Sequence, residues 1–243
     1  TGGPNDMTPE VYGALIDQAH SRGLRVASHL FYLEDAHGLL DAGVDVIAHS
    51  VRDQAVDDSL IEKILQQNVP YIPTLTRDLA RFVYETRPDF LEDPFFLRRA
   101  SAYQGDIDIV TGADYQATSR SPQRQTDKAG LEQGSQNLKT LSDAGVVIAM
   151  GSDSGTNQGQ WQGYFEHLEI EMMVDAGMST TQALVAATGG AAQAMGIDQS
   201  VGVLKPGRWA DLLVLDANPI ENIRATRQIH SVWVAGTPLS GVP

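Results

Sequence analysis

The sequence predicts an α/β fold of about four βα units, which is half of a (β/α)₈ TIM-type barrel, followed by a short β-rich segment. Two observations lead to this prediction. Short apolar runs recur along the chain, each preceded by a helical pattern, as is typical of parallel strands joined by helical crossovers. A helix-ending sequence also occurs twice almost unchanged, as LDAGV at residues 40–44 and SDAGV at residues 142–146. Four units are too few for a complete barrel but equal one half of it.

The first unit shows how each of these helices begins and ends. Thr8 suits the position before the helix and Pro9 its first turn, and apolar side chains then recur at helical spacing as far as Gly23. Residues 24–29 follow as a short strand that ends at His29. The later units repeat this order, with helices and strands at residues 34–42 and 44–49, at 57–67 and 69–75, and at a helix ending at 143–145 with a strand at 146–150.

Two parts of the chain depart from this rhythm. An insertion at about residues 76–126 is rich in aromatic side chains, and we expect either a lid or binding loop, or helices packed beside the barrel. After two further helices, residues 210–216 and 228–235 have the composition of strands. We therefore divide the chain into a partial barrel at residues 1–198 and a β segment at residues 199–243.

The composition narrows the function classes. The 243 residues contain 17 Lys and Arg against 31 Asp and Glu, which gives a formal net charge of −14. A surface this acidic repels nucleic-acid phosphates and anionic lipid headgroups, so we expect neither a nucleic-acid partner nor a membrane partner. The chain has no cysteine, so any metal ion must be bound by histidine and carboxylate side chains.

Three candidate metal ligands lie where predicted strands end. His29 ends the first strand, His49 ends the second, and Asp153 follows the fourth within the sequence MGSDSG. Barrel enzymes bind and react at the carboxyl ends of their strands, so these side chains are expected to face one site. Two imidazoles and a carboxylate suit a divalent metal such as zinc, and Asp153 could instead accept a proton from metal-activated water. Taken singly, each histidine would more often be a hydrogen-bonded core or surface residue.

Several segments resemble the amidohydrolase superfamily, in particular its imidazolonepropionase-like and metal-dependent dipeptidase (prolidase-like) group. ASH at residues 27–29 looks like the end of that family's strand 5, IAHS at 47–50 like strand 6, and MGSDS at 150–154 like strand 8. The most specific match is GVLKPGRWADLLVLD at residues 202–216, because in the family G-x-L-x-P-G-x-x-A-D-L leads into a small β-sandwich beside the barrel. The resemblance implies the C-terminal half of the barrel and the C-terminal part of a composite sandwich domain.

The resemblance implies that His29 and His49 ligate metal, and that Asp153 is both a ligand and the catalytic general base. Two family features are absent from the sequence: the strand-1 His-x-His motif, and the strand-4 lysine that bridges two metals in many members. We therefore expect one or two zinc ions in the parent protein, but one or none in this chain. The sequence begins where the loop after strand 4 would begin. We accordingly expect a truncated chain that forms a homo-oligomer or associates with the missing N-terminal half.

Three further residues are candidates for substrate binding. His167, in the sequence EHLE, resembles a family position near the substrate, with a helix-face contact to the barrel as the alternative. Tyr32 would offer a hydroxyl to the substrate, although some relatives carry tyrosine at the position of Phe31. Arg52 could bind a substrate carboxylate through two hydrogen bonds, with an ion pair to Asp53 as the alternative.

Together these features predict a metal-dependent hydrolase barrel that cleaves a C–N bond in an amide or peptide-like substrate. Dipeptidase activity, including the prolidase-like kind, is the first hypothesis, and a small molecule or dipeptide would be the substrate. Cyclic-amide hydrolysis of the imidazolonepropionase type is the alternative within the same class. From another class, the chain could be a truncated, non-catalytic half-barrel that self-associates. A phosphate-binding barrel is disfavoured because no glycine-rich loop precedes a helix.

Overall fold

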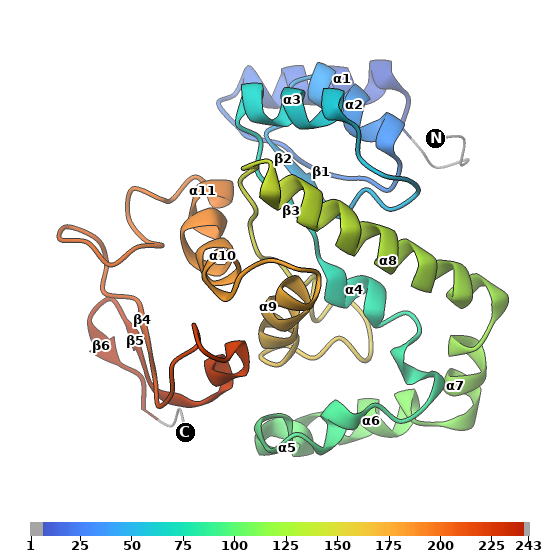
Figure 1. The fold of residues 1–243 in the computed structure, drawn as a ribbon, viewed down its shortest axis with the longest axis vertical. Helices are drawn as coiled ribbons and strands as arrows, with labels where there is room; N and C mark the ends of the chain where they lie inside the picture. Colours follow the sequence, from blue (N-terminus) through green and yellow to red (C-terminus); the bar gives the residue numbers. More distant parts are fainter. Residues whose placement is uncertain (1–6, 241–243) are drawn as a thin grey trace.

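The first part of the chain forms a small parallel sheet with helices on one side (Figure 1). The computed structural model describes residues 7–240, so the first six residues, where the resemblance places the loop after strand 4, lie outside the described residues. Helices and strands alternate as α1 (Pro9–His20), β1 (Ala27–His29), α2 (Leu33–Asp41), β2 (Val46–Ala48), α3 (Asp58–Gln67) and β3 (Tyr71–Ile72). The strands are parallel in the order β1-β2-β3. The expected α/β fold is therefore confirmed, while its extent as half a barrel stays a prediction.

Local sequence accounts for the ends of these helices. Thr8 precedes α1 and Pro9 lies in its first turn, as predicted, but the Thr8 side chain makes no cap hydrogen bond to the helix. At the start of α3 the Asp57 side chain accepts a hydrogen bond from the Leu60 amide at 2.7 Å, which satisfies one of the free N–H groups of the first turn. Asn68 ends the same helix in the left-handed conformation, which asparagine tolerates better than most residues.

The third predicted strand is shorter than the sequence suggests. β3 covers two residues instead of residues 69–75, and α4 (Leu75–Leu79) begins directly after Thr74. Pro70 and Pro73 lack the N–H group that a ladder needs, and Thr74 turns the chain with a φ of +50°. The segment that leaves the sheet therefore becomes a short helix at the edge where the candidate ligands lie.

The fourth predicted strand is reduced to a single point of pairing. Within residues 146–150, Ile148 forms one parallel bridge to Tyr71. Two backbone hydrogen bonds support this bridge, from Tyr71 N to Val147 O at 2.9 Å and from Ala149 N to Tyr71 O at 3.0 Å. The segment still runs parallel to β3, so its end lies at the same edge as the ends of β1 and β2.

The insertion is a set of packed helices, while its role as a lid or binding segment stays a prediction. It contains α4, α5 (Pro94–Ala100), α6 (Gln104–Val110), α7 (Ala113–Ser119), short 3-10 turns and the start of α8 (Pro122–Asp143). Its helices share a core with the loop before α9 (Phe165–Asp175), made by buried side chains such as Tyr84, Leu91, Phe96, Ile107, Trp161 and Phe165. Tyr84 joins the two parts, since its hydroxyl donates to Gly159 O at 2.6 Å and accepts from Trp161 Nε1 at 2.8 Å.

Three helices follow the fourth strand segment and complete the main core. These are α9, α10 (Thr180–Val185) and α11 (Ala191–Met195), with a π-helical segment, Ala186–Gly190, between the last two. A capping box is present at the start of α10, where Ser179 and Gln182 each bond to the other's backbone amide. No helix among residues 7–240 is long and apolar enough to cross a membrane.

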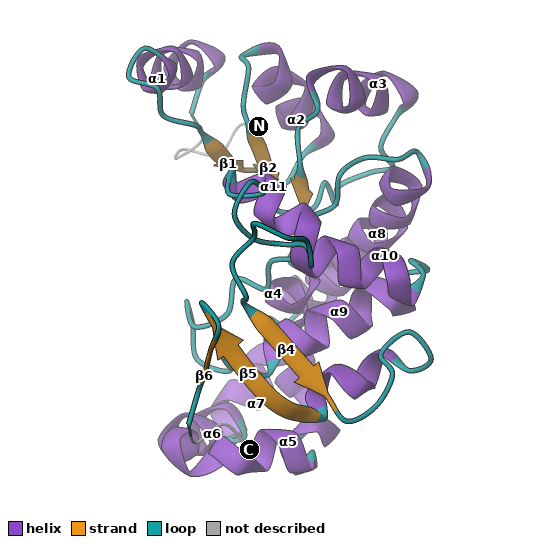
Figure 2. Cartoon of the chain, turned by 90° about the vertical axis from the view of Figure 1, so that its left-hand side faces the viewer, coloured by secondary structure: helices purple, strands orange, loops and turns teal. Residues whose placement is uncertain are grey.

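The last part of the chain forms an antiparallel sheet of β4 (Leu212–Leu215), β5 (Ile229–Val234) and β6 (Thr237–Pro238). Leu212 pairs with Trp233, and Trp233 pairs with Pro238 on its other side. Figure 2 shows this sheet apart from the parallel one, with α10 and α11 between the two. The two strands predicted at residues 210–216 and 228–235 are thus present in shorter form. The division into domains at residue 198 stays a prediction.

Candidate active site

A cavity of about 680 Å³ lies at the carboxyl ends of β1 and β2. Five of the six predicted site residues line it: His29, Tyr32, His49, Arg52 and Asp153. They come from three separate loops, which meet because the parallel register places strand ends at one edge. His167 is not part of the lining.

His29 and His49 face each other across the ends of two paired strands. The register sets His29 opposite Ala48, so that the next residue, His49, leaves the sheet beside it. Nδ1 of His29 lies 2.6 Å from Nε2 of His49, and the rings stack with centroids 4.7 Å apart and planes inclined by 27°. Two imidazole nitrogens therefore point at one place in the cavity.

The second ring nitrogen of His49 contacts a threonine outside the cavity lining. Its Nδ1 lies 2.7 Å from Oγ1 of Thr74, the residue that turns the chain after β3. Burial, together with the positive charge of Arg77, lowers the pKa of His49 to about 3. The ring is therefore neutral near pH 7, and a hydrogen bond from Nδ1 to Thr74 leaves the Nε2 lone pair directed at His29. Neutral imidazole is the form that binds a metal ion, and an outer hydrogen bond of this kind fixes its tautomer.

Asp153 enters the cavity from the loop that follows the fourth strand segment. Its backbone is left-handed, with a φ of +54°, which turns the side chain out of the strand direction. Gly151 allows this loop to pass close to β3, because a Cβ at that position would lie 2.7 Å from Cγ2 of Ile72. The hydroxyls of Ser152 and Ser154 flank Asp153, and both donate to Oε1 of Glu166.

Arg77 is a cavity residue that the sequence analysis does not single out. Its Nε lies 3.4 Å from Oδ2 of Asp153, and its Nη1 donates to Oδ1 of Asp78 at 2.8 Å. Arg77 lies in α4, inside the interval expected to be insertion, so its sequence position did not mark it. The available signal was its place two residues after the strand predicted at residues 69–75, near the edge where the strands of His29 and His49 end.

His29 and His49 are placed to bind a divalent cation, whereas the third predicted ligand, Asp153, is not. Two nitrogens bound to one tetrahedral zinc lie roughly 3.3 Å apart, so the facing rings need only a small opening to share an ion. Asp153 lies in the same cavity but pairs with Arg77. Among residues 7–240 no group of three or more His, Asp or Glu side chains is arranged to hold a metal ion. The structure therefore brings two of the three predicted ligands together, with the third near them and engaged elsewhere.

Arg52 has a different partner from the one its sequence suggested. Its guanidinium lies over the ring of Phe31 at 4.6 Å and reaches Asp78, with Nη1 3.5 Å from Oδ2. Asp53, the neighbour in sequence, instead accepts a hydrogen bond from the Leu33 amide at 2.9 Å and so caps α2. Arg52 is nevertheless part of the cavity lining, beside the candidate ligands.

The remaining two candidates differ in their distance from the cavity. Tyr32 is 39% exposed at its rim, with its ring against Phe31. His167 lies on α9 against the insertion and the C-terminal segment, where its ring contacts Phe95 edge-on and its Nδ1 is 3.1 Å from Oγ1 of Thr226. His167 is therefore on a helix face, but it contacts the insertion and the C-terminal segment, and it is absent from the cavity lining.

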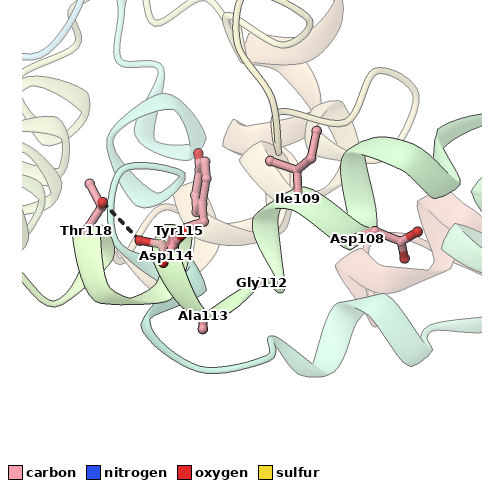
Figure 3. A pocket seen from close by; sticks show the side chains of 7 residues that line it. All are labelled: Asp108, Ile109, Gly112, Ala113, Asp114, Tyr115 and Thr118. Carbon is pink, nitrogen blue, oxygen red and sulfur yellow. Dashed lines mark hydrogen bonds between the residues drawn. The ribbon is translucent and has the colours of Figure 1, made fainter.

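A second cavity, of about 500 Å³, lies between α6 and α7 (Figure 3). Its charged side chains are Asp108 and Asp114, which come from the two different helices, and Thr118 donates a hydrogen bond to the backbone oxygen of Asp114 at 3.0 Å. It shares no lining residue with the first cavity and has no histidine or basic side chain in its lining. We therefore place the candidate active site in the first cavity.

Comparison with known proteins gives the family of the chain. The profile of the Amidohydrolase family matches residues 2–239, which is almost the whole chain. The chain belongs to the amidohydrolase family. The resemblance seen in the strand ends and in residues 202–216 is thereby confirmed.

Within the family, similarity extends to several kinds of protein. An imidazolonepropionase from Rhodococcus jostii is 32% identical over 134 residues, which cover 54% of this chain and 30% of that protein. Ochratoxinase from Aspergillus niger is 32% identical over 103 residues, which cover 40% of this chain and 20% of that protein. An uncharacterized protein from Mycobacterium tuberculosis is 29% identical over 128 residues, 46% of this chain and 34% of its own length. The match spans between a fifth and about a third of the length of these relatives.

Two solved structures overlay on nearly the whole chain. A candidate prolidase from Bifidobacterium longum has a TM-score of 0.68 and 30% identity, and the match covers 99% of this chain and 54% of that one. A Xaa-Pro dipeptidase with bound methionine has a TM-score of 0.68 and 24% identity, covering 99% of this chain and 51% of that one, so it shows the fold alone. The chain therefore corresponds to about half of each of these proteins.

Proposed function

We propose that this chain carries part of the active site of a metal-dependent hydrolase that cleaves a C–N bond in a peptide-like amide, in the manner of a dipeptidase or prolidase. One observation carries the proposal: His29 Nδ1 and His49 Nε2 converge to 2.6 Å in a cavity that Asp153 also lines. Family membership and the overlay on the candidate prolidase support the same reaction class.

Each residue of the site has a part in the proposed reaction. His29 and His49 would hold a divalent ion, which we propose is zinc, and when bound it would supply a Lewis acid and lower the pKa of a water molecule. The Asp153 carboxylate faces the cavity and would accept the proton from that water and pass it to the leaving nitrogen. For this step Asp153 must exchange part of its pairing with Arg77, whose Nε is 3.4 Å away.

The cavity lining favours a small substrate with one anionic and one apolar part. Two guanidinium groups, Arg52 and Arg77, lie in the lining of a protein whose formal net charge is −14. Leu15, Leu30 and Leu39 supply the apolar part of the same cavity. A dipeptide or related amide has a carboxylate that a guanidinium can bind through two hydrogen bonds. Arg77 is the more accessible of the two, with 25% of its side chain exposed against 9% for Arg52.

Two other hypotheses have an observation in their favour. The 32% identity to an imidazolonepropionase supports cyclic-amide hydrolysis at the same residues. The lack of a three-ligand group among residues 7–240 supports a non-catalytic half-barrel that self-associates. In either case β1 pairs with β2 alone within the described sheet, so we propose that its other edge meets a second copy or an N-terminal half. Partners would then be a small molecule and another chain, with no nucleic acid or membrane.

Metal content and hydrolysis, measured on the same sample, test the proposal. After dialysis against zinc or manganese, elemental analysis should find about one ion per chain, with most of it lost in His29→Ala and His49→Ala. Xaa-Pro dipeptides and a cyclic amide should then be compared as substrates, with Asp153→Asn as the matched inactive variant. Bound metal with hydrolysis of the cyclic amide alone would replace the dipeptidase reading by the imidazolonepropionase one. No bound metal and no hydrolysis of either compound would establish the non-catalytic reading.

A further inference from the structure

α9 contains a carboxylate, that of Glu169, which does not line the cavity. It accepts hydrogen bonds from the start of α4, the helix whose Arg77 does line the cavity. Glu169 is completely buried, with 0% of its surface exposed. Oε1 accepts from the Leu75 amide at 2.8 Å. Oε2 accepts from the amide and the hydroxyl of Thr76, both at 2.7 Å. Burying a carboxylate is costly unless its oxygens are hydrogen-bonded, and here three donors from one short segment compensate for that cost.

The segment that Glu169 binds is the one that supports the candidate ligands. Thr74, just before it, contacts Nδ1 of His49 at 2.7 Å. Arg77, just after it, pairs with Asp153. The Thr76 hydroxyl also lies 3.1 Å from the backbone oxygen of Ser152, the residue before Asp153. The two residues that Glu169 binds are thus the direct neighbours of Thr74, which contacts His49, and of Arg77, which pairs with Asp153.

Thr74 explains why the segment needs an acceptor from elsewhere. It occupies the cap position of α4, where threonine commonly accepts a hydrogen bond from the first turn, but here it makes no cap bond. Its hydroxyl contacts His49 instead. The amides of Leu75 and Thr76 are left without a local acceptor, and Glu169 accepts from both. The carboxylate from α9 therefore takes over the capping role and leaves Thr74 for the histidine.

We propose that Glu169 is a positioning residue of the candidate site, which holds the segment from Thr74 to Arg77 so that Thr74 orients His49 and Arg77 reaches Asp153. The role of this segment in catalysis rests on the proposed function. The positioning itself can be tested independently, because the hydrogen bond between His49 and Thr74 can be measured in the chain without metal. The competing explanation is that Glu169 only stabilises the fold, as any buried, hydrogen-bonded residue would.

NMR of the histidine side chains separates these two explanations. The His49 Nδ1 proton should be visible and slow to exchange with water in the unchanged chain. In Glu169→Gln an NH₂ group replaces one acceptor oxygen. We therefore expect the exchange of the His49 Nδ1 proton to be faster by roughly tenfold, the factor that corresponds to the loss of one hydrogen bond. Thr76→Val, which removes the hydroxyl, should act in the same direction, and Thr76→Ser should restore the slow exchange.

Glu171→Gln is the matched control, because Glu171 lies on the same helix, is 5% exposed and pairs with Arg224 and Arg227 instead. It should lower stability without changing the His49 signal. If Glu169→Gln lowers stability as much and leaves His49 unchanged, Glu169 is a structural residue and the proposal is wrong. Should Glu169→Gln not fold, the contrast between Thr76→Val and Thr76→Ser decides in the same way. A zinc titration of the same samples keeps the two hypotheses apart, since faster exchange without zinc binding would support positioning and contradict only the proposed function.

Discussion

The Nε atom of Arg77 lies 3.4 Å from Oδ2 of Asp153, within the cavity that also holds the two facing histidines. The ion pair places a positive charge in the cavity where a metal cation would be bound and occupies the carboxylate expected to be its third ligand. Arg77 therefore competes with a cation in two ways, by repulsion and by holding Asp153.

Arg77→Met should consequently raise the affinity for zinc. A unit charge several ångströms away in a partly exposed site is worth about 1–2 kcal/mol, so we expect an increase of roughly tenfold in a calorimetric titration. Arg81→Met is the control, because Arg81 pairs with Asp127 outside the cavity lining. Weaker zinc binding in Arg77→Met would contradict this prediction and would mean that Arg77 holds Asp153 in the orientation that zinc binding needs.

The contact between Thr74 and His49 gives a second prediction. Removing the outer partner of a metal-binding histidine typically weakens metal affinity by about 10–100-fold. Thr74→Val keeps the size of the side chain and removes the oxygen that lies 2.7 Å from Nδ1 of His49, so zinc affinity should fall by about that factor. His230→Ala should leave it unchanged, since His230 is exposed and pairs with Asp216. Equal zinc affinity in Thr74→Val and the unchanged chain would place the metal elsewhere.

The parts of the site that follow from strand order could be predicted from the sequence. His29 and His49 each follow a short β-rich run, and Asp153 lies just past a third such run. Parallel pairing places the ends of such runs at one edge whatever the details of the loops. That these three residues line one cavity was therefore accessible from pattern alone.

The residues that the sequence analysis missed depend on contacts between distant segments. Glu169 looks like an ordinary polar position on a helix, and its partners Leu75 and Thr76 are more than ninety residues away in sequence. Arg77 was hidden because the strand was expected to continue to residue 75, whereas the left-handed Thr74 starts a helix there. Nothing local in a sequence signals a buried carboxylate or a φ of this kind in threonine.

Two groups on α9 should make stability depend on pH in opposite directions. Burial lowers the pKa of His167 to about 4, below its ordinary value of 6.5, so its contribution is present above pH 6.5 and is lost as the pH falls toward 4. Burial raises the pKa of Glu169 to about 7 from 4.5, so its contribution is present below pH 4.5 and is lost as the pH rises toward 7. Each shift corresponds to roughly 3 kcal/mol over its full range.

Urea unfolding at pH 7 and at pH 5 tests both assignments. Between these values His167→Gln should lose less stability than the unchanged chain, by about 2 kcal/mol, because it no longer has to bind a proton on unfolding. Glu169→Gln should deviate by a similar amount in the opposite direction. Parallel pH dependence in all three chains would contradict the idea that either group changes its protonation on unfolding in this range.

The close approach of Gly190 to the fourth strand segment gives the last prediction. A Cβ at Gly190 would lie 2.2 Å from the backbone oxygen of Ile148, the residue that pairs with Tyr71. Gly190→Ala must therefore push the π-helical segment away from the sheet, and overpacking of this kind costs about 1–3 kcal/mol. Gly13→Ala is the matched control, since nothing lies within 4 Å of a Cβ there and alanine favours the interior of α1 by about 0.5–1 kcal/mol. Urea unfolding should thus show the same substitution lowering stability at one glycine and raising it at the other, and equal effects would mean that the contact between Gly190 and Ile148 is not tight.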